Sequence, residues 1–268
     1  MDVRTKSFLF QLALVQTLSP DVRASFWSLD KKDRRERHAR FDRGVLIRDH
    51  DAPLMSFSLF IDYTTESIIV TFPGTQTRGQ VDVYSTLRKA VMPWTESMPA
   101  HKGFLTLYLT IRDALKNELS VVCNEHSGYG LIFNGWSLGG TMCRFAAWDF
   151  LTSPDLYQSF FLSLWSSRRR DVFDRIVVTS WGAPKCFTHL SALAYSKHFA
   201  LHLEDFRYEV EGDPVTRLPP QWFDFYHVGT RIIVPNWMID EAGSWFEKFQ
   251  ARHFGYAQNT FFMFQHLV

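Results

Sequence analysis

Short hydrophobic runs rich in β-branched residues recur along the chain and are bounded by turn residues. The first two, residues 55–63 (MSFSLFIDY) and 67–72 (SIIVTF), are separated by a Thr-Thr-Glu turn, and the second ends at Pro73-Gly74. Runs of this length and composition predict β-strands. Four later runs have the same character: 129–134, 174–181, 206–211 and 229–235.

Segments with helical periodicity lie between these runs. Apolar residues in 101–119 recur at spacings of 4, 3, 4 and 4, which is the period of one buried helical face. These apolar residues are Phe104, Tyr108, Ile111, Leu115 and Leu119. Residues 141–151 also favour a helix and contain no proline. Strands that alternate with helices predict an α/β fold with a mostly parallel central sheet and helices on both faces.

A serine stands where one predicted strand meets the next predicted helix. The stretch Gly135-Trp136-Ser137-Leu138-Gly139 fits the G-x-S-x-G nucleophile elbow, a strained turn that raises the serine hydroxyl above the sheet. Glycines leave room where the strand and the helix approach each other, and such strain amounts to about 1–3 kcal/mol. The pattern is short, so its weight comes from the strand before it and the helix after it.

A nucleophilic serine needs a base within hydrogen-bonding distance, and that base needs an orienting group. In α/β-hydrolases the acid and then the histidine follow the serine along the chain. Asp213 is the preferred acid because it directly follows a predicted strand, in a loop stiffened by nearby prolines. The structural alternative for Asp213 is an Asp-Pro turn, and Asp205 and Asp240 are the other candidate acids.

Three histidines follow Asp213 in the chain. His253 is the preferred base, because it lies after the last predicted strand, where a loop could present it to Ser137. His227 stands just before that strand and is expected to be a structural hydrogen-bonding residue. His266 is close to the C-terminus, where chains tend to fray.

Composition and net charge limit the number of domains and the classes of partner. The 268 residues are 46% hydrophobic, so a single domain over 1–268 with a large core is expected. Lys and Arg total 29 against 28 Asp and Glu, and the net charge of +1 gives no overall field for nucleic acid. The basic runs at 31–43 and 166–170 are typical of solvated surfaces, with contact to anionic lipid headgroups as the alternative.

Cysteine spacing and hydropathy bear on the compartment. Cys123, Cys143 and Cys186 have neither metal-ligand nor disulfide spacing, so buried free thiols are expected. No apolar segment reaches the ~18 residues of a membrane span, which predicts a soluble protein, cytoplasmic or peripherally bound to a membrane. Residues 8–15 are expected to form an amphipathic first helix; a signal peptide, and hence secretion, is the less favoured alternative.

Seven separated stretches, taken in order, resemble the class 3 lipase family, the fungal triacylglycerol-lipase type within the α/β-hydrolases. The resemblance covers the chain from about Phe57 to Tyr256. No single stretch is decisive, but their order is. The stretches are IIVTFPGTQT (68–77), HKGFLTLY (101–108), GWSLGG (135–140), SWGAPK (180–185), EGDPVTRLPP (211–220), YHVGTRIIV (226–234) and HFGY (253–256).

This resemblance implies a role for each residue of a catalytic site. Ser137 would be the nucleophile, Asp213 the orienting acid and His253 the general base. The backbone N–H groups of Thr75 and Leu138 would form the oxyanion hole, to which the Thr75 hydroxyl could add a further donor; fixed donors in comparable sites are worth roughly 2.7–4 kcal/mol each. Thr75 also fits a plain turn residue after a glycine.

Three features depart from the family pattern. Trp136 stands before the nucleophile, where the family usually has histidine, and Pro73 replaces an arginine that is frequent in the oxyanion strand. Residues 152–171 are longer than a connection from helix to strand needs. The tryptophan leaves catalysis plausible but calls for a different packing beneath the elbow.

Residues 76–94 occupy the position of the family's lid. Tyr84, Leu87 and Val91 follow Val81 at spacings of 3, 3 and 4, so a helix here would carry one apolar stripe. The stripe would cover the active site in water and turn toward lipid when the lid opens. The alternative is an ordinary surface helix packed on the core.

The sequence therefore predicts a serine hydrolase that cleaves acyl esters of lipids through an acyl-enzyme. The alternative is a catalytically silent lipase-like module that binds a lipid or a protein partner. Retention of a serine, an acid and a histidine in order favours the enzyme. The expected partners are a lipid or small ester substrate and, peripherally, a lipid surface; no cofactor, metal or nucleic acid is implied. Which ester is cleaved depends on pocket shape, which no motif encodes.

Overall fold

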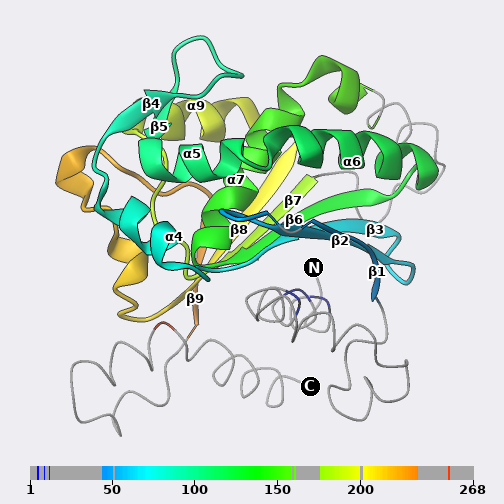
Figure 1. Ribbon diagram of the computed structural model, residues 1–268, viewed down its shortest axis with the longest axis horizontal. Coiled ribbons are helices and arrows are strands. Elements are labelled where there is room, and N and C mark those ends of the chain that lie inside the picture. Colours follow the sequence, from blue (N-terminus) through cyan, green and yellow to red (C-terminus); the bar gives the residue numbers. More distant parts are fainter. Residues whose placement is uncertain are drawn as a thin grey trace, which may run out of the picture.

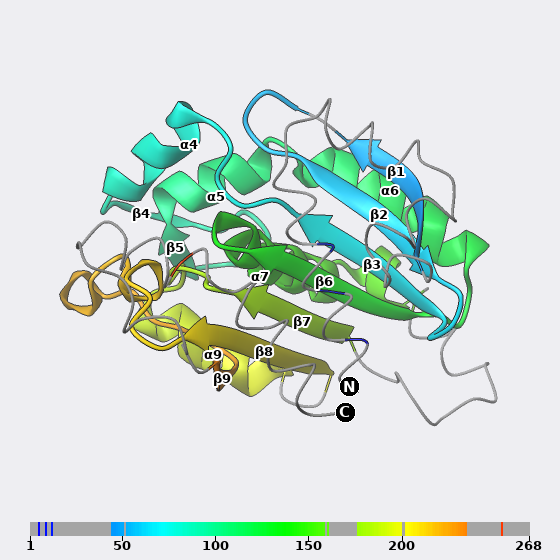
Figure 2. The ribbon, with the colours of Figure 1, turned by 90° about the horizontal axis from the view of Figure 1, so that it is seen from below.

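A computed structural model describes residues 5, 9, 12, 44–50, 52–158, 160, 176–199, 202–234 and 253. Within these residues a seven-stranded sheet in the order β1-β2-β3-β6-β7-β8-β9 forms the centre of the molecule (Figure 2). The first three strands are antiparallel, and those from β3 to β9 are parallel. The strands are β1 (Gly44–His50), β2 (Phe57–Asp62), β3 (Ser67–Phe72), β6 (Gly130–Trp136), β7 (Ile176–Trp181), β8 (Leu203–Val210) and β9 (Thr230–Val234).

Helices cover one face of this sheet (Figure 1). They are α5 (Lys102–Leu109), α6 (Arg112–Glu125), α7 (Leu138–Leu151) and α9 (His189–Phe199). Leu131 and Phe133 of β6 point into the core shared with these helices. Ile132 points to the opposite face, where it clusters with Leu9 and Leu12. Side chains on a strand alternate between faces, so a strand buried on both sides reads as a continuous apolar run.

The mostly parallel α/β sheet with helices is as predicted. Leu9 and Leu12 are helical and fully buried, in agreement with the expected first helix. Cys123, Cys143 and Cys186 are buried and free, and burial raises the pKa of the Cys123 and Cys186 thiols to about 12. The basic runs lie outside the described residues. Among the described helices, none has the length and hydropathy of a membrane-crossing segment.

The prediction of one continuous helix over 101–119 is wrong. His101 ends the short strand β5 (Pro99–His101), which pairs with β4 (Lys89–Val91), and its Nδ1 accepts a hydrogen bond from the Phe104 N–H at the start of α5. The chain turns at Thr110, whose hydroxyl donates to the Leu107 carbonyl oxygen. The turn keeps the apolar spacing intact, since all five expected core residues are buried: Phe104, Tyr108, Ile111, Leu115 and Leu119.

Candidate active site

Ser137 lies in the sharp turn between β6 and α7. Its φ of 54° and ψ of −121° lie outside the conformations that L-residues ordinarily adopt, and its N–H donates to the Trp181 carbonyl oxygen at 2.7 Å. Conformations of this kind cost about 1–3 kcal/mol and persist only where the surroundings enforce them. The nucleophile-elbow geometry expected from the sequence is therefore present.

Two glycines allow the strand and the helix to approach each other at this turn. A Cβ atom on Gly139 would overlap the carbonyl oxygens of Phe72 and Pro73. A Cβ on Gly135 would overlap the backbone of Gly139. The start of α7 thus packs directly on the end of β3, which brings the residues after Phe72 close to the turn that carries Ser137.

The structure brings Ser137, His253 and Asp213 together. The Nε2 atom of His253 is 3.0 Å from the Ser137 Oγ, and its Nδ1 is 3.0 and 3.1 Å from the two Asp213 carboxylate oxygens. All three side chains are buried. A neutral imidazole that donates from Nδ1 to the carboxylate presents an Nε2 lone pair to the serine hydroxyl. This arrangement is able to accept the serine proton.

The loop after β8 fixes the carboxylate of Asp213. Its Oδ1 accepts a hydrogen bond from the Val215 N–H at 2.9 Å, and its carbonyl oxygen accepts one from the Thr216 hydroxyl. A short 3₁₀ helix, η2 (Val215–Arg217), follows directly. Because these bonds hold the carboxylate in place, it is able to orient the imidazole of His253.

Asp205 and His227, the other candidate acid and base among the described residues, do not take part in this chain of hydrogen bonds. Both Asp205 oxygens accept from the Arg144 guanidinium, at 3.0 and 3.1 Å, on the helix side of the sheet. His227 donates from Nε2 to the Thr216 carbonyl oxygen at 2.6 Å, and burial holds the pKa of this histidine well below its usual value. These contacts fit the structural role expected for His227. Asp240 and His266 lie outside the described residues.

Trp136 packs against the side chain of His253. The two rings are stacked, with centroids 5.2 Å apart and planes at 24°. On its other side the indole fits against Gly74, where an added Cβ would lie 2.7 Å from the indole Cε3. Sequence reasoning identified this position only as a departure from the family pattern. The large aromatic ring takes part in placing the histidine.

The two residues expected to supply the oxyanion hole, Thr75 and Leu138, lie near the turn that carries Ser137. Thr75 follows the end of β3 and is partly buried. Leu138 is the first residue of α7, so its N–H has no partner within the helix. The close packing of β3 on α7 brings both groups to the same edge of the sheet.

The segment 76–94 does not form the single amphipathic helix expected of it. Thr77 caps the short helix α4 (Arg78–Asp82), η1 (Val83–Ser85) follows, and the chain then enters β4. Leu87 and Val91 therefore do not share a helical stripe with Tyr84. Gln80 ties the start of this segment to the loop before β2, because its buried side-chain amide accepts from the Thr77 N–H and donates to the Leu54 carbonyl oxygen.

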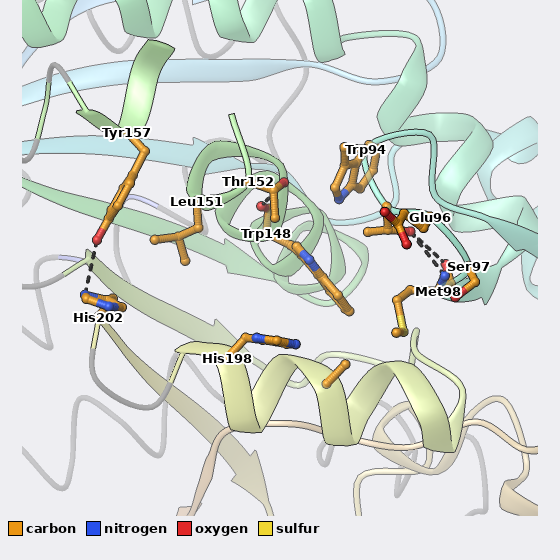
Figure 3. Close-up of a pocket in the computed structure, with 12 residues that line it drawn as sticks. Trp94, Glu96, Ser97, Met98, Trp148, Leu151, Thr152, Tyr157, His198 and His202 are labelled. Carbon is orange, nitrogen blue, oxygen red and sulfur yellow. Dashed lines mark hydrogen bonds between the residues drawn. The ribbon is translucent and has the colours of Figure 1, made fainter. Parts of the chain in front are cut away.

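A cavity of about 420 Å³ lies away from this site, at the other end of α7 (Figure 3). Trp148 and His198 line its middle, and the Tyr157 hydroxyl bonds to His202 Nδ1 at 3.1 Å at one end. Ser137 precedes the first residue of this 14-residue helix, and the cavity adjoins its last turn, about 20 Å away at 1.5 Å per residue. The geometry of the hydrogen-bonded side chains, and not the cavity, thus locates the candidate active site.

No group of three or more His, Cys, Asp or Glu side chains within the described residues is arranged to hold a metal ion. The arrangement at Ser137 is the one required for attack on a carbonyl by a side-chain oxygen, because nucleophile, base and orienting acid lie within hydrogen-bonding distance of one another.

Comparisons with known proteins agree with this geometry. The fold is similar to Rhizomucor miehei lipase in its propeptide complex (TM-score 0.66, 19% identity), with 87% of this chain and 68% of that chain covered. It is also similar to lipase II from Rhizopus niveus (TM-score 0.67, 16% identity; 87% and 80% covered). A third similar structure is a triacylglycerol lipase whose catalytic centre is a serine protease triad (TM-score 0.65, 17% identity; 86% and 78% covered).

Identities this low establish the fold alone. The sequence itself carries the stronger comparison, because the model of the lipase (class 3) family matches residues 69–223, more than half of the 268 residues. The matched range includes Ser137 and Asp213, and His253 lies beyond it. This chain belongs to the class 3 lipase family.

Proposed function

We propose that this protein is a serine hydrolase that cleaves acyl esters of lipids through a covalent acyl-enzyme. The observation that carries the proposal is the continuous hydrogen-bond chain from Ser137 through His253 to Asp213. Membership of the class 3 lipase family supports lipid esters as the substrate class. One of the structurally similar proteins, a triacylglycerol lipase, uses a serine protease triad.

In the first half of the reaction, Ser137 Oγ attacks the carbonyl carbon of the ester. His253 Nε2 accepts the hydroxyl proton as the new bond forms, and Asp213 stabilises the resulting imidazolium without taking its proton. The tetrahedral intermediate then collapses. The ester carbon–oxygen bond breaks, the alcohol leaves with the proton from His253, and the acyl group stays on Ser137.

In the second half, water takes the place of the alcohol. His253 Nε2 accepts a proton from the attacking water, a second tetrahedral intermediate forms, and the carboxylic acid leaves as the proton returns to Ser137 Oγ. In both halves the negative charge on the former carbonyl oxygen is stabilised by the N–H groups of Thr75 and Leu138. Donors fixed in advance act strongly in a site shielded from water, because they need no reorganisation during the reaction.

An exposed apolar surface near the site supports contact with a lipid surface. Leu87 and Val91 are 37% and 52% exposed, and Trp222 in the 3₁₀ helix η3 (Gln221–Phe223) is 82% exposed. The Lys89 ammonium joins the two segments by an ion pair with Asp224 at 2.7 Å. Exposed apolar side chains gathered from two adjoining segments are typical of interaction sites, and tryptophan favours the boundary between water and lipid.

We retain only part of the segment 76–94 as a candidate lid. Ser137 is only 4% exposed, so a lipid ester reaches its hydroxyl only after covering groups have moved. Gln80 ties the beginning of the segment 76–94 to the core. We therefore limit the candidate lid to the part after Tyr84, which carries the exposed Leu87 and Val91 and whose movement would break the Lys89–Asp224 ion pair.

Hydrolysis of p-nitrophenyl butyrate by the purified protein tests the proposal. The wild-type chain is expected to turn over, with a burst of p-nitrophenol if deacylation is slow, and Ser137→Ala is expected to retain only background activity. Absence of turnover in a folded wild-type sample, on short and long acyl chains alike, would instead favour a silent lipase-like module that binds a lipid or a protein.

A further inference from the structure

The phenol of Tyr84 lies at the candidate oxyanion hole. Its oxygen is 3.3 Å from the Thr75 Oγ1, a distance at which one hydroxyl donates to the other. Ser137 lies close enough to the same phenol to influence its pKa through a side-chain hydrogen bond. Tyr84 was expected to be part of an apolar stripe on a lid. Its hydroxyl instead faces two polar groups of the site.

The packing around Tyr84 fixes this hydroxyl in place. The tyrosine ring makes an edge-to-face contact with Phe104 of α5, with centroids 5.0 Å apart. The start of α5 also fits closely against the same turn, since a Cβ on Gly103 would lie 2.7 Å from the Val83 carbonyl oxygen. Gln80 anchors the preceding helix through the Leu54 carbonyl oxygen. The turn η1 is therefore held from both sides.

The Tyr84 and Thr75 hydroxyl groups carry one proton each, and the hydrogen bond between them uses only one of the two. When Tyr84 donates to Thr75 Oγ1, the Thr75 O–H is left to donate to a third atom. Burial raises the pKa of the Tyr84 phenol, although hydrogen bonds with Thr75 and Ser137 lower it in part, so the phenol keeps its proton at neutral pH. A donor to Thr75 also polarises the Thr75 O–H, because consecutive hydrogen bonds strengthen one another.

We propose that Tyr84 is a positioning residue of the oxyanion hole, which orients the Thr75 hydroxyl so that it donates to the developing oxyanion beside the Thr75 and Leu138 N–H groups. This inference rests on the proposed esterase function and deepens it. The contrary reading is that Tyr84 blocks the site and must leave before substrate binds. The two readings predict opposite effects when the hydroxyl is removed.

Tyr84→Phe removes the hydroxyl and keeps the ring against Phe104. We expect kcat on p-nitrophenyl butyrate to fall roughly five- to twentyfold, with KM changed by less than about twofold, because a transition-state interaction is lost. The inhibition constant of an alkyl boronic acid, which forms a tetrahedral adduct on Ser137, should rise by about the same factor. Tyr63→Phe, which alters a tyrosine in the turn after β2, is the matched control and should change neither quantity.

Variants at Thr75 separate positioning from general damage. In a Thr75→Val background, which lacks the oriented hydroxyl, Tyr84→Phe should cause almost no further loss of kcat, whereas in Thr75→Ser it should cause the full loss. These comparisons also decide the matter if Tyr84→Phe alone lowers the yield of folded protein. An unchanged or higher kcat in Tyr84→Phe, or a loss that adds fully to that of Thr75→Val, would overturn the inference while wild-type turnover still supports the esterase. If the folded wild-type protein shows no turnover and does not bind the boronic acid, the esterase proposal fails and this inference fails with it.

Discussion

The indole of Trp136 stacks on the imidazole of His253 at a centroid separation of 5.2 Å, beside the hydrogen bond between the Ser137 hydroxyl and His253 Nε2. The two residues are far apart in the chain, and the tryptophan belongs to the elbow strand itself. The side chain of Trp136 thus supports His253, which is hydrogen-bonded to the next residue in the chain, Ser137.

Removal of this aromatic contact should weaken catalysis as well as folding, because the indole is buried in a cluster with Trp181 and Tyr208. Stacked aromatic pairs are worth about 0.5–1.5 kcal/mol, so Trp136→Ala should lower kcat roughly three- to tenfold through a less well-oriented His253. Trp136→Phe retains a ring and should keep most of the activity. Initial rates on p-nitrophenyl butyrate, with thermal unfolding as the folding check, decide the matter. Equal activity in the Ala and Phe variants would show that the stack does not orient the histidine.

Asp213→Asn should leave the fold intact and reduce kcat by a large factor, about 10⁴ in a comparable triad, since an amide holds the imidazole in the wrong tautomer. His227→Ala is the matched control among partly buried polar residues near the site, and it should mainly lower the free energy of unfolding. Activity assays on the purified variants measure kcat, and urea unfolding measures the free energy of unfolding. Near-normal turnover in Asp213→Asn would show that another carboxylate is the orienting acid. Loss of turnover in His227→Ala but not in His253→Ala would show that His227 is the base.

The buried imidazole of His101 should make the stability of the protein depend on pH. Burial lowers the pKa of His101 to about 4, whereas an unfolded histidine titrates near 6.5. The unfolded state therefore binds more protons between these values, and the free energy of unfolding decreases as pH falls from 6.5 toward 4, by at most about 3 kcal/mol at ~1.4 kcal/mol per pKa unit. His227, whose pKa is also lowered by burial of its ring atoms, acts in the same direction.

Urea unfolding at pH 7.5 and pH 5 checks this expectation. His101→Asn keeps an acceptor for the Phe104 N–H at the start of α5 and does not titrate, so it should lose less stability between the two pH values than the wild-type chain. An equal loss in both proteins would place the titrating groups elsewhere.

Contact with lipid should depend on the exposed apolar side chains. Burial of a large apolar side chain contributes about 1.5–3 kcal/mol, so Trp222→Ala and the pair Leu87→Ser with Val91→Ser should each weaken sedimentation with phosphatidylcholine vesicles by tenfold or more. The pair should also flatten the rise in rate when an ester exceeds its solubility, and a soluble short-chain ester should be almost unaffected. Val121→Ser removes a comparable exposed side chain from α6 and should change nothing. If vesicle binding is unchanged in Trp222→Ala and in the Leu87→Ser, Val91→Ser pair, this surface is not the one that contacts lipid.

Local sequence patterns predicted six of the seven strands of the sheet, all except β1, and they selected Ser137, Asp213 and His253 as the candidate site. Continuous apolar runs predict strands buried on both faces, and the structure has β2, β3, β6 and β7 at the expected places. The elbow was predictable because the close approach of strand and helix requires glycine. Chain order reduced ten histidines to three. The hydrogen bonds of His253 and Asp213 agree with the choice made from position alone.

Contacts between distant segments were not predictable in this way. The helical period is the same on both sides of Thr110, so it gave no sign that α5 ends there. The segment 76–94 carries the spacing of a helical stripe, but the buried Gln80 and the half-buried Tyr84 tie it to other parts of the fold through partners that no local pattern specifies. The stack of Trp136 on His253 depends likewise on how two remote parts of the chain meet.

Labelling with a fluorophosphonate, followed by peptide mapping, tests the central claim most directly, because the reagent captures an activated serine in the folded protein. The proposed mechanism predicts one modified residue, Ser137, with labelling abolished in Ser137→Ala, greatly slowed in His253→Ala and absent from unfolded protein. Modification of a different serine, or no modification of a folded wild-type sample, would contradict it.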